Sequence, residues 1–151
     1  MKYIVVDTCI VMHVIRGKAK GQQANEYLYN HPDNPTLVVS VVTKAELLSL
    51  AIQLKWGADK RQLVEDFLKS VTIVDINNTD DDLMTAYADI DAYSKGKGVD
   101  KNGNLKTGSA NMIGKNDLWI AATAKVLDAT LLTSDGDFDH LTGVFLTIEK
   151  Q

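Results

Sequence analysis

The chain has 151 residues, of which 45% are apolar and 24% charged, with a formal net charge of −4. This balance argues against disorder and predicts a single soluble domain, residues 1–151, with a core of its own. No run approaches the roughly 18 apolar residues of a membrane span, and the N-terminus shows no signal-peptide pattern. A single cysteine, Cys9, excludes an internal disulfide framework and fits a reducing compartment, so we expect a cytoplasmic protein without membrane contact.

Apolar runs alternate with amphipathic stretches along the chain. The runs rich in Val, Ile and Leu predict buried parallel strands at 2–6, 36–41, 71–75, 129–133 and 144–148. The stretches between them predict helices at 9–16, 22–30, 43–56, 59–70 and 80–94, and a further helix from Asp117, with Gly57 ending the third. This alternation predicts an α/β layer fold, in which ligands bind beyond the carboxyl ends of the strands.

Four carboxylates lie at strand ends or helix starts of this predicted fold. Asp7 ends the first apolar run and Glu46 lies just beyond the second. Asp117 begins a helix that is apolar on nearly every side, and Asp135 follows the run at 129–133. If these ends converge, the four acids form a site for a hard cation that can hydrolyse phosphodiesters.

Each acid also has an ordinary explanation. Asp7 suits a helix N-cap, and Thr43 with Glu46 fits a capping box. Asn116 is a good N-cap that would place Asp117 in a first helical turn, where the helix dipole favours an acid. Asp135 and Asp137 compete for the site role, and we favour Asp135 because it lies nearer the strand end. A solvated turn is the alternative explanation for these acids.

The ligand chemistry separates hard cations from zinc. Oxygen-only ligands suit Mg²⁺ or Mn²⁺, whereas zinc prefers cysteine and histidine. The histidines at 13, 31 and 140 lack zinc-like spacing. We therefore expect Mg²⁺, or Mn²⁺, as the cofactor, with Asp7 and Asp117 as direct ligands. Glu46 would be a ligand or would orient the water, and Asp135 would bind the ion directly or through a water.

The ordered motifs Val6-Asp7-Thr8, Ser40 to Leu47, Asn116 to Ala122 and Leu131 to Phe138 span nearly the whole chain. Together they resemble the PIN-domain nucleases, and most closely the VapC toxins of toxin–antitoxin pairs. The resemblance implies a three-layer α/β/α sandwich with a mostly parallel sheet. It also implies a metal-dependent endoribonuclease that cleaves RNA, often structured RNA such as tRNA, and that forms homodimers and binds a cognate antitoxin.

The same resemblance implies the site residues Asp7, Glu46, Asp117 and Asp135. Hydroxyl and amide groups expected to support them are Thr8, Ser40, Thr43, Asn116 and Thr133, together with the Asp137 carboxylate. Cys9 stands where Asn or Ser is common, which places one supporting hydrogen bond in question.

Residues 95–115 hold five glycines, and five lysines against one aspartate, a local charge of +4. We expect these lysines to contact RNA phosphates beside the site: Lys95, Lys97, Lys101, Lys106 and Lys115. A solvated mobile loop is the equal alternative.

Two other function classes stay open on the sequence. A non-catalytic PIN-like module would bind RNA or a protein without cleaving, although such a module need not keep all four acids. A small-molecule phosphohydrolase would use the same metal chemistry on phosphate esters.

Overall fold

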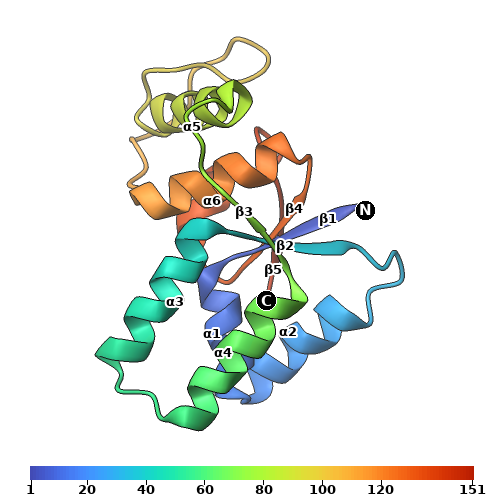
Figure 1. Cartoon of the computed structure of the whole chain (residues 1–151). Helices are drawn as coiled ribbons and strands as arrows, with labels where there is room; N and C mark the ends of the chain where they lie inside the picture. Colours follow the sequence, from blue (N-terminus) through green and yellow to red (C-terminus); the bar gives the residue numbers. More distant parts are fainter.

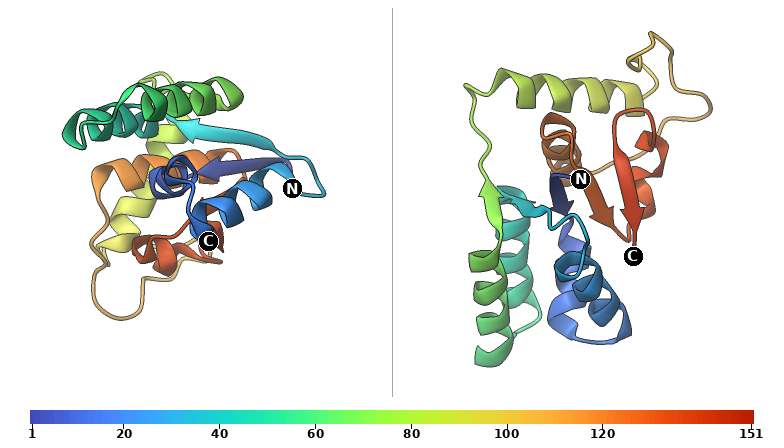
Figure 2. Two further views of the ribbon diagram at one scale, coloured as in Figure 1. Left: turned by 90° about the horizontal axis from the view of Figure 1, so that it is seen from below. Right: turned by 90° about the vertical axis from the view of Figure 1, so that its right-hand side faces the viewer.

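The computed structural model describes all residues, 1–151. Five strands form one sheet in the order β3-β2-β1-β4-β5, and every neighbouring pair is parallel. They are β1 (Tyr3–Val6), β2 (Thr36–Ser40), β3 (Thr72–Val74), β4 (Thr130–Thr133) and β5 (Thr147–Lys150). Figure 2 (right) shows the sheet with β3 at one edge and β5 at the other. The predicted parallel α/β/α sandwich is confirmed.

Helices cover both faces of this sheet (Figure 1). One layer holds α1 (Thr8–Arg16), α2 (Ala19–Tyr29), α3 (Val41–Gln53) and α4 (Ala58–Ser70). The other holds α5 (Asp81–Ser94), α6 (Lys115–Val126) and the short 3₁₀ helix η1 (Gly136–Leu141). None of these helices is both long and apolar enough to span a bilayer.

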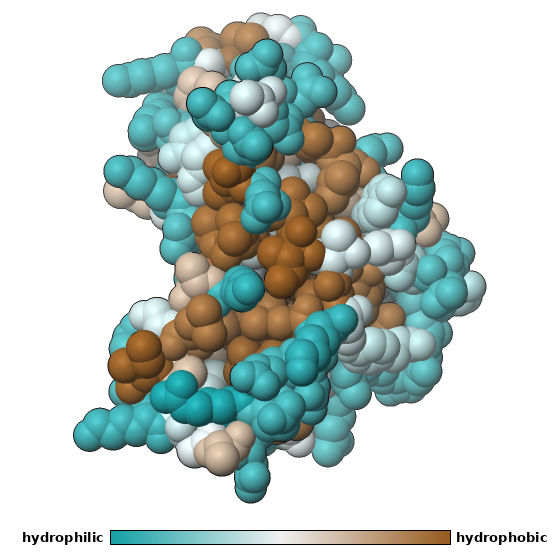
Figure 3. All heavy atoms as spheres, in the orientation of Figure 1, coloured by the Kyte–Doolittle hydropathy of each residue, from teal (hydrophilic) through white to brown (hydrophobic).

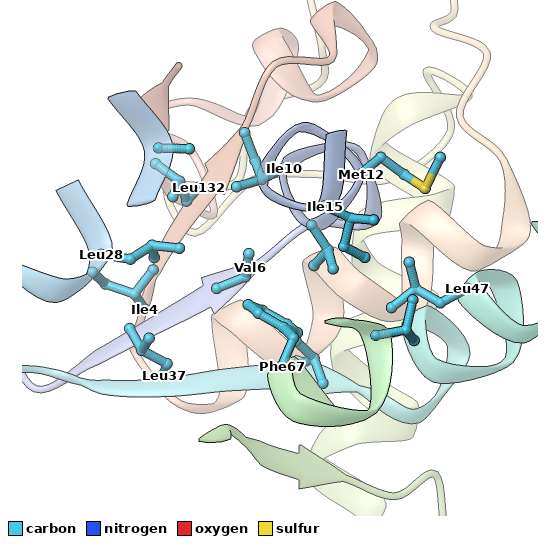
Figure 4. Packing of buried hydrophobic residues seen from close by; sticks show 14 of the residues in the cluster. Ile4, Val6, Ile10, Met12, Ile15, Leu28, Leu37, Leu47, Phe67 and Leu132 are labelled. Atoms are coloured by element: carbon cyan, nitrogen blue, oxygen red, sulfur yellow. The ribbon is translucent and has the colours of Figure 1, made fainter. Parts of the chain in front are cut away.

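The strands supply side chains to two cores because successive residues point to opposite faces. Ile4 and Val6 pack with α1 to α4, and Phe67 of α4 closes that core (Figure 4). Val5 lies on the other face, with α5, α6 and η1. The central strand β1 is therefore buried on both sides, as its continuous apolar run predicted.

Several predicted boundaries move when cap geometry is considered. The third helix begins at Val41, not Thr43, because the Ser40 hydroxyl caps it by accepting from the Val42 amide. Gly57 does not end this helix; it is the N-cap of α4, and Lys55 takes the left-handed conformation at the turn. The second helix begins three residues early, at Ala19, and the last strand starts at Thr147, not at 144.

Residues 95–114 contain no helix or strand beyond one isolated bridge between Val99 and Leu105. The segment is nevertheless fastened at its base. The Asn111 amide donates to the Ser94 carbonyl over 2.8 Å, and the buried Ser94 hydroxyl lies 2.7 Å from Nε2 of His140 in η1. The loop thus connects α5 to α6 and is tied to η1.

Candidate active site

The predicted convergence of acids rests on the parallel sheet. β1 and β4 are neighbours, so their carboxyl ends bring Asp7 and the Thr133–Asp137 turn together. α6 begins at Lys115 and holds Asp117 in its first turn, and α3, which follows β2 directly, carries Glu46 in its second turn. Four separate elements therefore deliver carboxylates to one edge of the sheet.

Asp7 is almost fully buried and is held by three donors. Its Oδ1 accepts from the Thr8 amide over 2.7 Å, as an N-cap of α1. Its Oδ2 accepts from the Thr133 hydroxyl over 2.7 Å and from the Cys9 thiol over 3.1 Å. Asp7 is thus both helix cap and site acid, and the thiol supplies the hydrogen bond that the Cys9 substitution had placed in question.

Glu46 does not form the predicted capping box. Thr43 is a buried residue inside α3 and not its N-cap. The Thr8 hydroxyl instead donates to Glu46 Oε1 over 3.0 Å and lies 3.1 Å from the Thr43 hydroxyl. Burial raises the pKa of Glu46, as does the charge of Asp7, while Thr8 and Asn116 act to lower it. Glu46 therefore faces the site.

Asn116 is likewise not a cap, because Gly114 precedes the first helical residue of α6. Its side chain lies beside Glu46 and lowers the pKa of that acid. The prediction that α6 is a buried helix is confirmed, since Leu118, Ile120 and Ala121 have almost no exposure. Asp117 is thus the half-buried polar tip of an apolar helix.

The contest between Asp135 and Asp137 ends with both beside Asp117. One carboxylate oxygen from each of Asp117, Asp135 and Asp137 lies within 4.8 Å of the others. Asp135 caps η1 by accepting from the Asp137 amide over 2.9 Å, and its own amide donates to the Thr133 hydroxyl over 2.9 Å. The tight Asx turn therefore aims two acids where sequence reasoning had expected one.

Repulsion among these acids acts on Asp117. Its pKa rises to about 7, first through burial and then through the charges of Asp7, Asp135, Glu46 and Asp137. Burial also raises the pKa of Asp7, against three hydrogen bonds that lower it. Five clustered acids without a cation are electrostatically unfavourable, which is the setting that a bound metal relieves.

The donor set fits Mg²⁺ or Mn²⁺. All of the grouped ligand atoms are carboxylate oxygens, which magnesium and manganese accept and which zinc sites rarely use alone. Oxygens bound to one such ion lie at most about 4.2 Å apart, so the observed spacing needs only small side-chain shifts. Asp117, Asp135 and Asp137 are the residues that could hold the ion, with Asp7 and Glu46 at its border.

The lysines of the 95–115 segment are spread over the molecule rather than gathered. Lys115 begins α6, two residues from Asp117. Lys101 instead lies with Asp128 and Ala129 around a hollow of about 540 Å³ past the other end of α6, and the length of that helix separates it from Asp117 by about 16 Å.

The three remaining loop lysines have local surroundings. Lys95 pairs with Asp91 over 3.0 Å, and Lys97 is exposed in the turn after α5. The ammonium group of Lys106 donates to the carbonyls of Thr107 and Ser109. Among the loop lysines, only Lys115 is close in sequence to a site acid, two residues before Asp117. Lys106 lies near His140 of η1, whose pKa is lowered first by burial and then by the Lys106 charge.

The family model for the PIN domain matches residues 4–144, nearly the entire chain. The chain belongs to the PIN domain family. Membership supports a hydrolase that acts on nucleic acids. No curated protein matches the sequence.

Several solved structures share this fold. A VapBC2 chain from Rickettsia felis has a TM-score of 0.73 at 23% identity, with 98% of each chain covered. A VapBC-1 chain from nontypeable Haemophilus influenzae has a TM-score of 0.71 at 24% identity, covering 99% of this chain and 98% of the other. A VapBC-5 chain from Mycobacterium tuberculosis, a member of the VapBC family of toxin–antitoxin systems, has a TM-score of 0.61 at 25% identity over the full length of both chains.

Proposed function

We propose that this PIN domain is a metal-dependent endoribonuclease and the toxin of a toxin–antitoxin pair. The observation that carries the proposal is the group of three carboxylates at Asp117, Asp135 and Asp137, with the buried Asp7 and the half-buried Glu46 beside them. The fold shared with VapBC structures supports the toxin assignment. A cognate antitoxin, a homodimeric assembly and a cytoplasmic location belong to the same proposal.

The acids divide the work by their surroundings. Asp117, Asp135 and Asp137 would hold Mg²⁺ or Mn²⁺, and the ion would neutralise their charge, acidify a water and polarise the phosphate. Asp7 keeps its place through Thr8, Thr133 and Cys9, so that its charge stays fixed at the sheet edge. Glu46, whose Oε1 accepts from the Thr8 hydroxyl, would accept a proton from the attacking water.

RNA contacts remain part of the proposal for the loop lysines. Lys115 is the one next to Asp117 and is assigned to the phosphate at the site. Lys95, Lys97, Lys101 and Lys106 would meet RNA further from the scissile bond. Their charges suit a substrate whose backbone is anionic.

Replacement of Asp7 by asparagine tests the function. Asp7→Asn should abolish Mg²⁺-dependent RNA cleavage, because it removes a fixed charge from the site, while circular dichroism shows an intact fold, since asparagine also caps helices. Asp128→Asn is the matched control, as Asp128 is exposed at a left-handed position that asparagine also adopts. Full cleavage by Asp7→Asn would reject this assignment.

A further inference from the structure

A compact basic hollow lies where α1 turns into α2. It measures about 370 Å³ and is lined by His13, Arg16, Lys18 and Lys20, with Ala19 and Gly21 between them. No acidic residue occurs between Asp7 and Glu26 in the sequence, and none of the ion pairs in the structure includes Arg16, Lys18 or Lys20. Three full positive charges thus stand without an anionic partner in a protein of net charge −4.

The hollow is built rigidly. Gly17 takes the left-handed conformation that ends α1, with φ of 67°. α2 then folds back so closely that a side chain at Gly21 would place its Cβ 2.0 Å from the His13 carbonyl oxygen. This approach allows only glycine, and it fixes the first turn of α2, including Lys20, beside the last turn of α1, including Arg16.

The hollow is connected to the acids through His13. The imidazole Nε2 lies 3.3 Å from the hydroxyl of Ser134, the residue directly before Asp135. Burial lowers the pKa of His13, and the charges of Lys20 and Arg16 lower it further. The histidine is thereby held toward its neutral form, so the positive charge of the hollow comes from Arg16, Lys18 and Lys20.

The hollow and the acid site lie at opposite ends of α1. α1 starts at the acid site, with Asp7 as its N-cap, and leads away from the carboxyl edge of the sheet to Gly17 (Figures 1 and 2). The rise of an α-helix puts Arg16 about 14 Å from Asp7. A few nucleotides of a single strand cover such a distance, so one RNA chain can occupy the acids and the hollow together.

We propose that the hollow at the α1–α2 turn binds backbone phosphates of the single-stranded RNA that flanks the cleaved bond. The proposal rests on the proposed nuclease function and adds the path of its substrate: along α1, past Ser134 and His13, to Arg16, Lys18 and Lys20. Guanidinium and ammonium groups that lack carboxylate partners are the groups that recognise phosphate. Contacts of this kind position the strand without reading its bases.

Binding of a labelled single-stranded RNA oligonucleotide, followed by fluorescence anisotropy over a range of salt concentrations, tests the proposal. Asp117→Asn in the full chain with Mg²⁺ serves as the background in which RNA stays uncleaved. Adding Arg16→Gln and Lys20→Gln should weaken binding roughly tenfold and lower the slope of log K against log salt by about 1.4, since each lost phosphate contact to a single strand removes about 0.7.

Lys60→Gln with Lys69→Gln is the matched control, because it removes the same charge from two exposed positions on α4. This control pair should leave the RNA affinity and the slope of log K against log salt unchanged. Arg16→Lys, which keeps the positive charge, should retain most of that slope. Equal losses from both pairs, or an unchanged slope for the Arg16 and Lys20 pair, would overturn the proposal. Unchanged RNA binding with weakened binding of an acidic peptide would also overturn it and assign the hollow to a protein partner.

Failure of this inference is distinguishable from failure of the proposed function. A chain that binds RNA through the hollow but leaves it uncut when Asp117 is intact would contradict the nuclease assignment alone. A chain that cleaves RNA at the same KM with and without Arg16 and Lys20 would contradict the phosphate path alone.

Discussion

Asp117 is the acid of the site whose charged form is most destabilised by its surroundings. Its pKa of about 7 lies above the ordinary value of 3.8, so the folded protein binds this proton more tightly than the unfolded chain does. The contribution of Asp117 to stability is therefore complete below about pH 4 and is lost as pH rises through 7. In EDTA, we expect the melting temperature to fall between pH 5 and 8 more steeply for the wild type than for Asp117→Asn.

Mg²⁺ should make the melting temperature depend less on pH, because a bound cation favours the ionised acids. Thermal melting at several pH values, with and without Mg²⁺, is the measurement. The same pH slope for wild type and Asp117→Asn would show that the site acids do not repel one another as described.

Thr133 is the residue on which the placement of Asp7 depends. Its fully buried hydroxyl donates to Asp7 Oδ2 and accepts from the Asp135 amide. Thr133→Val keeps the shape but leaves both partners short of a hydrogen bond, and should lower the free energy of unfolding in urea by about 1–3 kcal/mol. Thr130→Val, at a buried threonine of the same strand without a side-chain hydrogen bond, should change it little.

For helices and strands, the sequence predicted the type of each element better than the residues at which it begins and ends. The five strands and the six α-helices were foreseen, because buried parallel strands are continuous apolar runs and most of the helices are amphipathic, whereas the short 3₁₀ helix η1 was not. The observed starts differ from the predicted ones where caps decide them. The N-cap of α3 is Ser40 and not Thr43, and the N-cap of α6 is Gly114 and not Asn116. Such caps depend on side-chain contacts across elements, which spacing along one chain does not contain.

The convergence of the acids was predictable for the same reason, and its local contacts were again missed. Parallel strands deliver their ends to one edge, so Asp7 and Asp135 followed from topology. The joint use of Asp135 and Asp137 needed the Asx turn of η1, and the Cys9 contact needed the first turn of α1. The hollow lined by Arg16 and Lys20 was missed because only the fold-back at Gly21 gathers its charges.

The 95–114 segment depends on its anchors. Ser94→Ala removes the 2.7 Å contact with His140 Nε2 and leaves both ring nitrogens without a side-chain partner. We expect faster amide hydrogen exchange in the segment, while β1 and β4 stay protected. Thr85→Ala, at an exposed position on α5, is the control. Unchanged exchange in Ser94→Ala would mean that the Ser94–His140 contact does not order the loop.

Apolar and basic residues occupy different parts of the surface of the whole molecule, and each part suits a different kind of partner. The face shown in Figure 3 carries apolar atoms across its middle, between α5 above and α3 and α4 below. The edge strand β3 lies on this face, and its Ile73 and Val74 are only half buried. An open strand edge beside apolar side chains supports the proposed protein partners, whereas the basic turn between α1 and α2 suits RNA.

In the proposed function, the converging acids cleave RNA with the help of a cation. Mapping cleavage positions in total RNA incubated with the purified protein tests it most directly, with Mg²⁺, with EDTA, and with Mg²⁺ restored after EDTA. We expect discrete cuts with Mg²⁺, none with EDTA, recovery when Mg²⁺ is restored, and none at any stage with Asp117→Asn. Cuts that persist in EDTA or in Asp117→Asn, or the absence of cuts with Mg²⁺ or Mn²⁺, would contradict it.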